Sequence, residues 1–471
     1  MRKLEGLKPE KVFFYFEEIC AIPHGSGNTD QISDYCVDFA KSRNLEYTKD
    51  EYNNVIIKKA ASSGYEDHPA VIIQGHLDMV CEKEETAAIN MHTQGLDITH
   101  DGEYVFANGT TLGGDDGIAV AMALAILDDD NIVHPPLEIV FTTDEETGMD
   151  GAVGLDTSSL KSKTLLNIDS ECEGVLTVSC AGGAHVKIDI PLESETTEGN
   201  CYKIKIDGLI GGHSGVEIDK GRLNSNKVIA KLLSTFDFDY KIAKIGGGLK
   251  DNAIPRTSEC VLFTDTDIES YCNNFISNNK IKTDPDLTVS LTKSSCKASA
   301  YTVSDSKRIV KFLASVENGV IKMSDDIDGL VQTSLNLGIL ACNQNSITAS
   351  FAVRSSKNNE KTELVDALKK RAESFGGTLN SSAHYPAWEY KQDSRLRDTM
   401  VTVYKKMYNK TPVVEAIHAG LECGLFCDKI DGLDAVSFGP DMCDIHTTRE
   451  RLNIASTERT FKYLCNVLKE L

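Results

Sequence analysis

Short apolar segments alternate with helical patterns along the first 185 residues of the chain. Segments 70–74 and 137–142 are rich in Val and Ile, and segment 164–168 is a weaker third apolar run. Each is followed by a loop that contains Gly or Asp, which is typical of a strand that ends in a turn. Residues 117–127 lie between the first two runs and are apolar on all sides, which predicts a buried helix. This alternation predicts a mainly parallel sheet covered by helices.

The pattern changes in the middle of the chain. Residues 186–385 are richer in Ser, Thr, Asn and Lys and contain charged, strand-like segments such as Tyr202–Ile206. After Trp388 a helical pattern returns at 396–407, and a strand-like segment follows at 435–438. We therefore predict an α/β domain made of residues 1–185 and 386–471, interrupted by an inserted α+β domain of residues 186–385.

Composition and charge narrow the class of partner. The chain has 471 residues, with 49 Lys and Arg against 71 Asp and Glu, so its formal net charge is −22. A charge of this sign disfavours nucleic acid and anionic membrane surfaces as partners. The apolar run at 117–127 is far shorter than the ~20 residues of a membrane span, and the N-terminal residues lack a signal-peptide pattern. The 14 cysteines are scattered singly, which predicts reduced thiols in a cytoplasmic protein.

Residues that commonly bind metal ions occur in four loops of the predicted α/β domain. The loops are Gly75–Asp78, Gly113–Gly117, Thr143–Gly148 and Asn167–Glu171. Ligand sites in open α/β sheets form beyond the carboxyl ends of the strands, so we expect these loops to meet in one crevice. Carboxylates gathered there would repel one another unless a multivalent cation lay among them. The combination of imidazole and carboxylate favours zinc over calcium or magnesium.

Two of these loops have further features of a metal site. His76 and Asp78 are two residues apart in an extended segment, so their side chains share a face. A carboxylate at that place can hold the second N–H of a zinc-binding imidazole. In the loop that opens the buried helix, glycines let the backbone approach a cation, and the helix N-terminus favours a carboxylate.

Several motifs resemble a known family. They are Gly-His-Leu-Asp-Met-Val at 75–80, Thr-Thr-Leu-Gly at 110–113, Thr-Asp-Glu-Glu-Thr-Gly at 143–148, Asn-Ile-Asp-Ser-Glu at 167–171, Cys-Ala-Gly-Gly at 180–183 and His-Ala-Gly-Leu-Glu-Cys-Gly at 418–424. Together they resemble the aminoacyl-histidine dipeptidases, the cytosolic, carnosinase-like branch of the di-zinc exopeptidases that include aminoacylase and acetylornithine deacetylase. The resemblance runs over nearly the whole chain. It implies an α/β/α catalytic domain of the zinc-exopeptidase type with an inserted α+β lid domain.

The resemblance also implies two zinc ions per chain, for which Co or Mn are possible substitutes. By position in the motifs, one zinc would be held by His76, Asp115 and Asp169. The other would be held by Asp115, Glu146 and His446, with Asp115 bridging the two ions.

A hydrolytic mechanism follows from the resemblance. Glu145 would be the general base that takes the proton of a metal-bridging water and passes it to the departing amine. The choice of Glu145 over Glu146 rests on family position, because spacing alone does not separate them. Asp78 would orient His76.

The inserted domain would supply contacts to the substrate. His213 would donate a hydrogen bond to the tetrahedral oxyanion when the lid closes, either within one chain or from the partner chain of a homodimer. A guanidinium fits the terminal carboxylate of a peptide bidentately, although ion pairs within the domain are the alternative role of the arginines. The substrate-binding candidates are Asn252, Arg256, Arg354, His418 and Glu422.

Two positions depart from the family pattern. Asp116 stands where this branch usually has Asn, which adds an acid beside the bridging ligand. His446 is followed by Thr447 and Thr448 rather than by Ser-Pro, so we expect the loop that carries His446 to differ from that of its relatives.

We therefore predict a zinc metallo-dipeptidase that acts on small peptides, with Xaa-His dipeptides of the carnosine type among the substrates. A tripeptidase or an N-acyl-amino-acid deacylase on the same scaffold is the alternative enzyme. A metal-binding relative without catalytic activity is the alternative from another class, although the presence of Glu145 beside a complete ligand set disfavours it.

Overall fold

The chain divides into two compact units in a computed structural model that describes residues 2–279 and 281–471. Unit 1 comprises Met1–Ser179, Tyr390–Ala416 and Leu421–Leu471, and unit 2 comprises Cys180–Glu389 and Ile417–Gly420. The sequence placed the breaks at 185/186 and 385/386. The observed breaks lie a few residues outside these, because the Cys180 N–H donates a hydrogen bond to the Trp388 carbonyl where the two connections run together. The short excursion 417–420 into unit 2 was not predicted.

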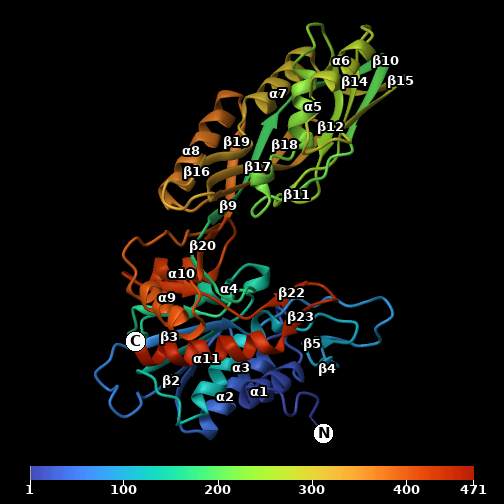
Figure 1. The fold of residues 1–471 in the computed structure, drawn as a ribbon. Helices are drawn as coiled ribbons and strands as arrows, with labels where there is room; N and C mark the ends of the chain where they lie inside the picture. Colours follow the sequence, from blue (N-terminus) through green and yellow to red (C-terminus); the bar gives the residue numbers. More distant parts are fainter. Residues whose placement is uncertain (1, 280) are drawn as a thin grey trace. The chain divides into compact units, whose positions relative to one another are not determined.

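An eight-stranded sheet forms the centre of unit 1 (Figure 1), with strand order β1-β2-β6-β3-β7-β21-β8-β20. Its strands are β1 Glu46–Lys49, β2 Val55–Lys59, β3 Val71–His76, β6 Leu137–Thr142, β7 Thr164–Asn167, β8 Val175–Cys180, β20 Val413–Ile417 and β21 Asp434–Ser437. The four central strands, β6, β3, β7 and β21, run parallel, as predicted. At the flanks β2 pairs with β6, and β8 with β21, in antiparallel fashion, a detail that the prediction of a mainly parallel sheet did not include.

Both faces of the central strands are buried, which explains their continuous apolar runs. Ile73 and Ile139 face one way and belong to a core shared with helices α1 Glu10–Cys20, α2 Asp30–Ser42, α3 Gly114–Leu127, α9 Arg395–Tyr408 and α11 Ile454–Glu470. Ile72 and Val140 alternate with them and are buried on the opposite face. Helix α10 (Glu422–Lys429) packs against β21 and against α4 (Asp150–Gly154). A four-stranded sheet joins β4 Ile98–His100, β5 Tyr104–Ala107, β22 Met442–Cys443 and β23 Arg451–Asn453.

Unit 2 is built on a nine-stranded sheet in which the pairs are antiparallel, for example β10 with β14 and β17 with β18. Its strands are β9 Gly182–Pro191, β10 Ser194–Asp207, β12 Lys241–Gly247, β14 Ser258–Phe263, β15 Thr288–Tyr301, β16 Gly319–Met323, β17 Val331–Asn343, β18 Ser346–Ser355 and β19 Thr378–Tyr385. Helices α5 Ser225–Leu233, α6 Glu269–Asn279, α7 Val303–Ser315 and α8 Asn358–Ser374 pack on the sheet around one apolar core. A two-stranded ladder joins β11 Gly212–His213 to β13 Ala253–Ile254. The predicted α+β character of this segment is therefore present.

Among the described residues, no helix combines the length and the apolar character that crossing a membrane would require.

Candidate metal centre and active site

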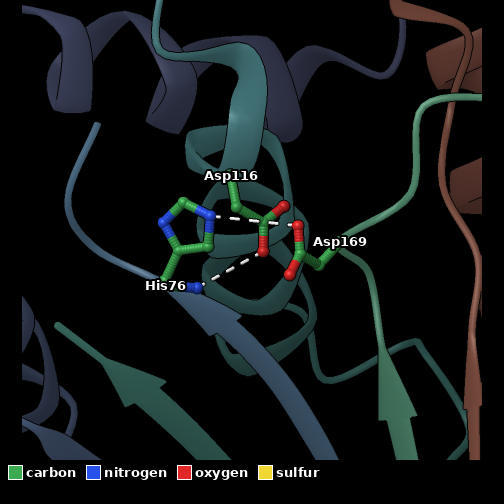
Figure 2. Close-up of side chains that lie close together, drawn as sticks. All are labelled: His76, Asp116 and Asp169. Carbon is green, nitrogen blue, oxygen red and sulfur yellow. Dashed lines mark hydrogen bonds and ion pairs between the residues drawn. The ribbon is translucent and has the colours of Figure 1, made fainter. Parts of the chain in front are cut away.

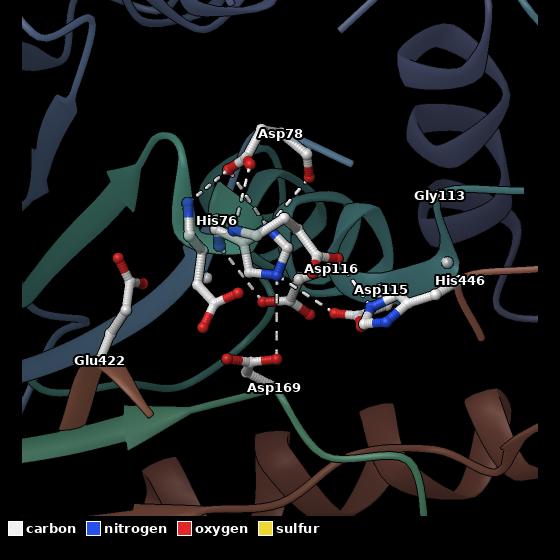
Figure 3. Close-up of polar contacts among 12 residues, drawn as sticks. His76, Asp78, Gly113, Asp115, Asp116, Asp169, Glu422 and His446 are labelled. Atoms are coloured by element: carbon white, nitrogen blue, oxygen red, sulfur yellow. Dashed lines mark hydrogen bonds and ion pairs between the residues drawn. The ribbon is translucent and has the colours of Figure 1, made fainter. Parts of the chain in front are cut away.

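The predicted ligand residues of unit 1 converge at the carboxyl ends of the parallel strands (Figure 3). His76 is the last residue of β3, and Asp169 lies two residues beyond β7. Asp115 lies at the start of α3, where its backbone has non-helical φ and ψ. Glu146 belongs to a short 3₁₀ helix, Glu145–Thr147, that follows β6, and His446 lies between β22 and β23.

Asp115 lies between the two histidines. Its Oδ1 is 3.1 Å from His76 Nε2, and its Oδ2 is 3.1 Å from His446 Nε2. His76 Nε2 also lies 3.9 Å from Asp169 Oδ1, and His446 Nε2 lies 2.9 Å from Glu146 Oε1. The donor atoms of Asp115, Glu146 and His446 are close enough together to bind one metal ion. Asp115 therefore lies next to both histidines, but the group of donor atoms around His76 and Asp169 that could hold a metal ion contains Asp116 and not Asp115.

Asp116 is a further acid of this cluster (Figure 2). Its side chain is fully buried, and its Oδ2 accepts a hydrogen bond of 3.3 Å from the His76 N–H. Its Oδ1 is buried without a hydrogen-bond partner among the described residues. Asp116, His76 and Asp169 form another group that could hold a metal ion. The sequence analysis noted this acid but gave it no place among the ligands.

The concentration of buried acids fits a cation site. Burial raises the pKa of Asp169 well above its usual range, and the neighbouring Asp116 adds to that effect. Burial likewise raises the pKa of Asp116 well above its usual range. Carboxylates held this closely are costly to ionise together in the absence of a positive partner. A multivalent cation would remove that cost, so the donor set fits the predicted metal ions.

The Asp78 carboxylate organises the backbone around the cluster. It lies 3.5 Å from His76 Nδ1, whose hydrogen bond of 2.9 Å is made with the Asp78 carbonyl oxygen. The carboxylate accepts hydrogen bonds from the Ser26 hydroxyl at 2.7 Å and from the Glu145 N–H at 3.1 Å. The backbone carbonyl of Asp78, and not the carboxylate expected for this role, makes the shorter contact with His76 Nδ1, while the carboxylate fixes the loop that carries Glu145. The sequence analysis missed Ser26, because the contact joins segments 52 residues apart.

Glu145 lies beside the ligands. Its carboxylate, that of Glu146 and the ring of His76 form a third group of donor atoms within reach of one another. Burial raises the pKa of Glu145 to about 8. A carboxyl group with a pKa in this range can both accept and donate a proton near neutral pH.

Glu450 holds the loop of His446 in place. Its buried carboxylate accepts hydrogen bonds from the Leu112, Gly113 and Gly114 N–H groups at 2.8, 3.3 and 2.7 Å. This contact joins the end of the His446 loop to the backbone just before Asp115. The loop therefore brings His446 to Asp115 despite the Thr447–Thr448 departure. This role of Glu450 was not predicted from the sequence, because the N–H groups that donate to its carboxylate lie more than 300 residues away in the chain.

In unit 2, three of the predicted residues influence one another. The Arg354 guanidinium donates a hydrogen bond of 3.0 Å to the Tyr385 hydroxyl. His213 Nδ1 accepts hydrogen bonds from the Gly215 and Val216 N–H groups, and burial, with the charge of Arg354, lowers the pKa of His213. Burial and Arg354 also lower the pKa of His418 to about 3. Both imidazoles are therefore neutral at neutral pH.

The two remaining candidates of unit 2 are exposed. The Asn252 carbonyl accepts a hydrogen bond from the Ser214 N–H, which places Asn252 next to the loop of His213. Arg256 Nε donates to the Leu209 carbonyl at 3.2 Å.

Glu422 was expected to line the substrate cleft, but its side chain is fully buried in unit 1. Its Oε2 accepts hydrogen bonds from Gln74 Nε2 at 2.6 Å and from the Thr142 hydroxyl at 2.7 Å. Burial raises the pKa of Glu422 to about 7. This environment belongs to the interior of the sheet and does not suit a contact with substrate.

The comparisons with known proteins agree with this geometry. Residues 72–470 match the model of peptidase family M20/M25/M40. The cytosol non-specific dipeptidase of Escherichia coli (strain K12) is 34% identical over 482 residues, covering 100% of this chain and 99% of that protein.

Two solved structures extend the comparison. Aminoacylhistidine dipeptidase from Vibrio alginolyticus matches with a TM-score of 0.93 and 32% identity, over 99% of this chain and 98% of that one. A tripeptidase from Staphylococcus aureus subsp. aureus mu50 matches with a TM-score of 0.57 and 15% identity over 98% of each chain, which shows a shared fold. The predicted fold class and the resemblance inferred from the motifs are confirmed. The chain is a member of peptidase family M20/M25/M40.

Proposed function

We propose that this chain is a cytoplasmic metallopeptidase that hydrolyses dipeptides, Xaa-His dipeptides among them. The full-length relative with 34% identity is named a cytosol non-specific dipeptidase, and the structure with a TM-score of 0.93 is an aminoacylhistidine dipeptidase. The observation that carries the proposal is Asp115, whose two carboxylate oxygens each lie 3.1 Å from a different histidine. A carboxylate placed in this way is suited to bridge two metal ions.

We assign one metal ion to His76, Asp115 and Asp169, and the other to Asp115, Glu146 and His446. Zinc suits this mixture of imidazole and carboxylate donors, with cobalt or manganese as substitutes. Bound ions of this kind polarise a substrate carbonyl and lower the pKa of water.

Glu145 is the proposed general base. Its carboxylate accepts the proton of the attacking water and then donates it to the departing amine. The pKa of about 8 that burial gives Glu145 suits both transfers. Asp78 supports this role by holding the Glu145 backbone through its N–H.

Unit 2 supplies the proposed substrate contacts. The Arg354 guanidinium is suited to pair with the terminal carboxylate of a dipeptide. Its hydrogen bond to the Tyr385 hydroxyl helps to hold the guanidinium in place. The neutral His213 donates a hydrogen bond to the oxyanion that forms as water attacks. The remaining candidate contacts are Asn252, Arg256 and His418.

A substrate panel tests the proposed activity. The protein is stripped of metal with a chelator, reloaded separately with Zn²⁺, Co²⁺ or Mn²⁺, and assayed on dipeptides, β-alanyl-histidine, tripeptides and N-acyl amino acids. We expect metal-dependent cleavage of dipeptides, with little cleavage of the other two classes. Preference for tripeptides or N-acyl amino acids would replace the proposed substrate class. Tight metal binding without hydrolysis of any substrate would overturn the enzyme assignment.

Mixing two inactive variants tests whether His213 acts within one chain or across a homodimer. We propose His213→Ala and Glu145→Gln for this purpose. Partial recovery of activity on mixing would show that a chain can use the partner's histidine, because one mixed site would then be intact. No recovery, with exchange of subunits demonstrated separately, would place His213 in the site of its own chain.

A further inference from the structure

A buried polar network crosses the three parallel strands that lead to the metal cluster. Glu422 Oε2 accepts hydrogen bonds from Gln74 of β3 at 2.6 Å and from Thr142 of β6 at 2.7 Å. Gln74 Oε1 in turn accepts a hydrogen bond of 2.6 Å from Asn167 Nδ2 of β7. The Gln74 amide also donates to the Thr142 hydroxyl at 3.1 Å. We call these four side chains the strand-end network.

On β3 and β7 the network lies one step below the proposed ligands, whereas on β6 Thr142 lies level with His76. Gln74 precedes His76 by two residues, and Asn167 precedes Asp169 by two residues. Within β3, residues two apart point to the same face, about 7 Å apart. Gln74 and Asn167 are also direct neighbours in the β3–β7 ladder, and Thr142 pairs with His76 in the β3–β6 ladder. The network therefore ties together the strand ends from which His76 and Asp169 extend.

None of the four side chains can touch a substrate from its present position, because each is at most 1% exposed. Glu422 comes from the first turn of α10, which packs against the central sheet, and Figure 3 shows it to one side of His76 and Asp169. A buried carboxylate is costly unless donors satisfy it, and here two side chains satisfy Oε2, whereas Oε1 has no hydrogen-bond partner among the described residues. Removing a side chain that hydrogen-bonds directly to a metal ligand commonly changes metal affinity by about 10- to 100-fold. Glu422 reaches the ligands through Gln74 and Thr142, so its effect belongs at the lower end of that range.

We propose that Glu422 is a positioning residue for the metal ion assigned to His76 and Asp169, and that it acts by holding Gln74 and Thr142. The proposal rests on the metal site of the proposed function but not on dipeptide cleavage. The feature that acts is the hydrogen-bond acceptor at Oε2. The negative charge of the carboxylate is not needed for this positioning.

The test compares the metal affinity of four variants with that of the native protein by competition with a chromophoric chelator. Glu422→Leu removes the acceptor, whereas Glu422→Gln keeps an amide oxygen that can accept from both partners. Thr142→Val removes one donor with little change in volume. Glu138→Leu is the matched control. Glu138, like Glu422, is a buried acid, but it lies near the start of β6 and accepts hydrogen bonds from the Lys161 and Ser162 N–H groups.

We expect Glu422→Leu to weaken the binding of one metal equivalent by about tenfold, with the second equivalent less affected. Glu422→Gln should restore affinity to within about threefold of the native protein, and Thr142→Val should fall between the two. Glu138→Leu should lower the unfolding temperature of the metal-free protein without changing metal affinity.

Equal affinity in Glu422→Leu and the native protein would overturn the proposal. So would an equal loss in Glu422→Gln, which would show that charge is the active feature, or an equal loss in Glu138→Leu, which would show a general effect of destabilisation. Should Glu422→Leu fail to fold, Thr142→Val decides the matter. A native protein that binds metal but cleaves no dipeptide would refute the proposed function and leave this comparison of affinities valid.

Discussion

Asp115 is the residue on which both proposed metal positions depend, because each of its oxygens faces a different histidine. His446, in contrast, contacts only the group formed with Asp115 and Glu146 among the described residues. Substituting each side chain in turn therefore compares the loss of a ligand shared by both metal ions with the loss of a ligand of one ion.

We predict that Asp115→Asn loses both tightly bound metal equivalents, whereas His446→Ala loses one. The amide of Asn is a weaker ligand than a carboxylate and cannot bridge two cations through two anionic oxygens. Metal analysis after gel filtration in metal-free buffer measures the number of metal ions bound per chain. Retention of both equivalents in Asp115→Asn would contradict the bridging assignment.

At the residue scale, the sequence predicted the ligand types but not the contacts that hold them. His76, Asp115 and Glu146 were proposed as ligands from their positions in the family motifs, and the structure places their side chains in one cluster. Asp116 and Glu450 received no such role, because their surroundings come from distant segments of the chain. Glu422 was placed in the wrong environment for the same reason: its motif shows where it lies in the chain but not which face of the sheet it covers.

At the scale of elements, the start of α3 lies tightly against β3 at Gly75. A Cβ atom at Gly75 would lie 2.6 Å from Asp116 Oδ2 and 2.7 Å from the Ala119 Cβ. These distances are shorter than normal van der Waals contacts, so β3 and α3 could not keep their present separation with a larger residue at this place.

We predict that Gly75→Ala lowers the free energy of unfolding by about 1–3 kcal/mol and weakens metal binding, because His76 follows directly. The matched control is Gly117→Ala on α3, whose added Cβ would meet Phe16 Cε2 at 3.4 Å, an ordinary contact. That control should be neutral or slightly stabilising, since Ala has a better helix propensity than Gly. Denaturant unfolding and chelator competition measure the two effects. Native stability in Gly75→Ala would contradict the close approach.

The elements themselves were predicted well where the apolar pattern is strong. The buried helix expected at 117–127 and the strand expected at 137–142 correspond to α3 and β6. The antiparallel flanks of the sheet were missed, because direction is decided by which strands become neighbours and a single apolar run carries no such information.

At the scale of the whole molecule, the chemistry is divided between two compact units. The candidate metal ligands lie in unit 1, whereas His213 and Arg354 lie in unit 2. The excursion of residues 417–420 places His418 in unit 2 although its neighbours in the chain belong to unit 1. Sequence texture led to the proposal of an inserted domain at 186–385, but it could not predict so short an excursion, which has no compositional signal.

We predict that Arg354→Met leaves the metal content and the stability of metal-bound unit 1 unchanged while raising KM for dipeptides by about tenfold or more, because it removes the partner of the terminal carboxylate. Steady-state kinetics with metal analysis on the same sample measures both quantities. Loss of metal in this variant, or an unchanged KM, would contradict the assignment of Arg354 to substrate binding.

The central claim is that Glu145 is the base of a metal-dependent peptidase, and Glu145→Gln tests it most directly. The amide preserves the shape of the side chain but does not accept a proton. We predict that the variant, loaded with zinc, retains about two metal equivalents per chain and loses dipeptide turnover by at least ~10³-fold. Turnover close to that of the native protein, with both metal ions bound, would contradict the account.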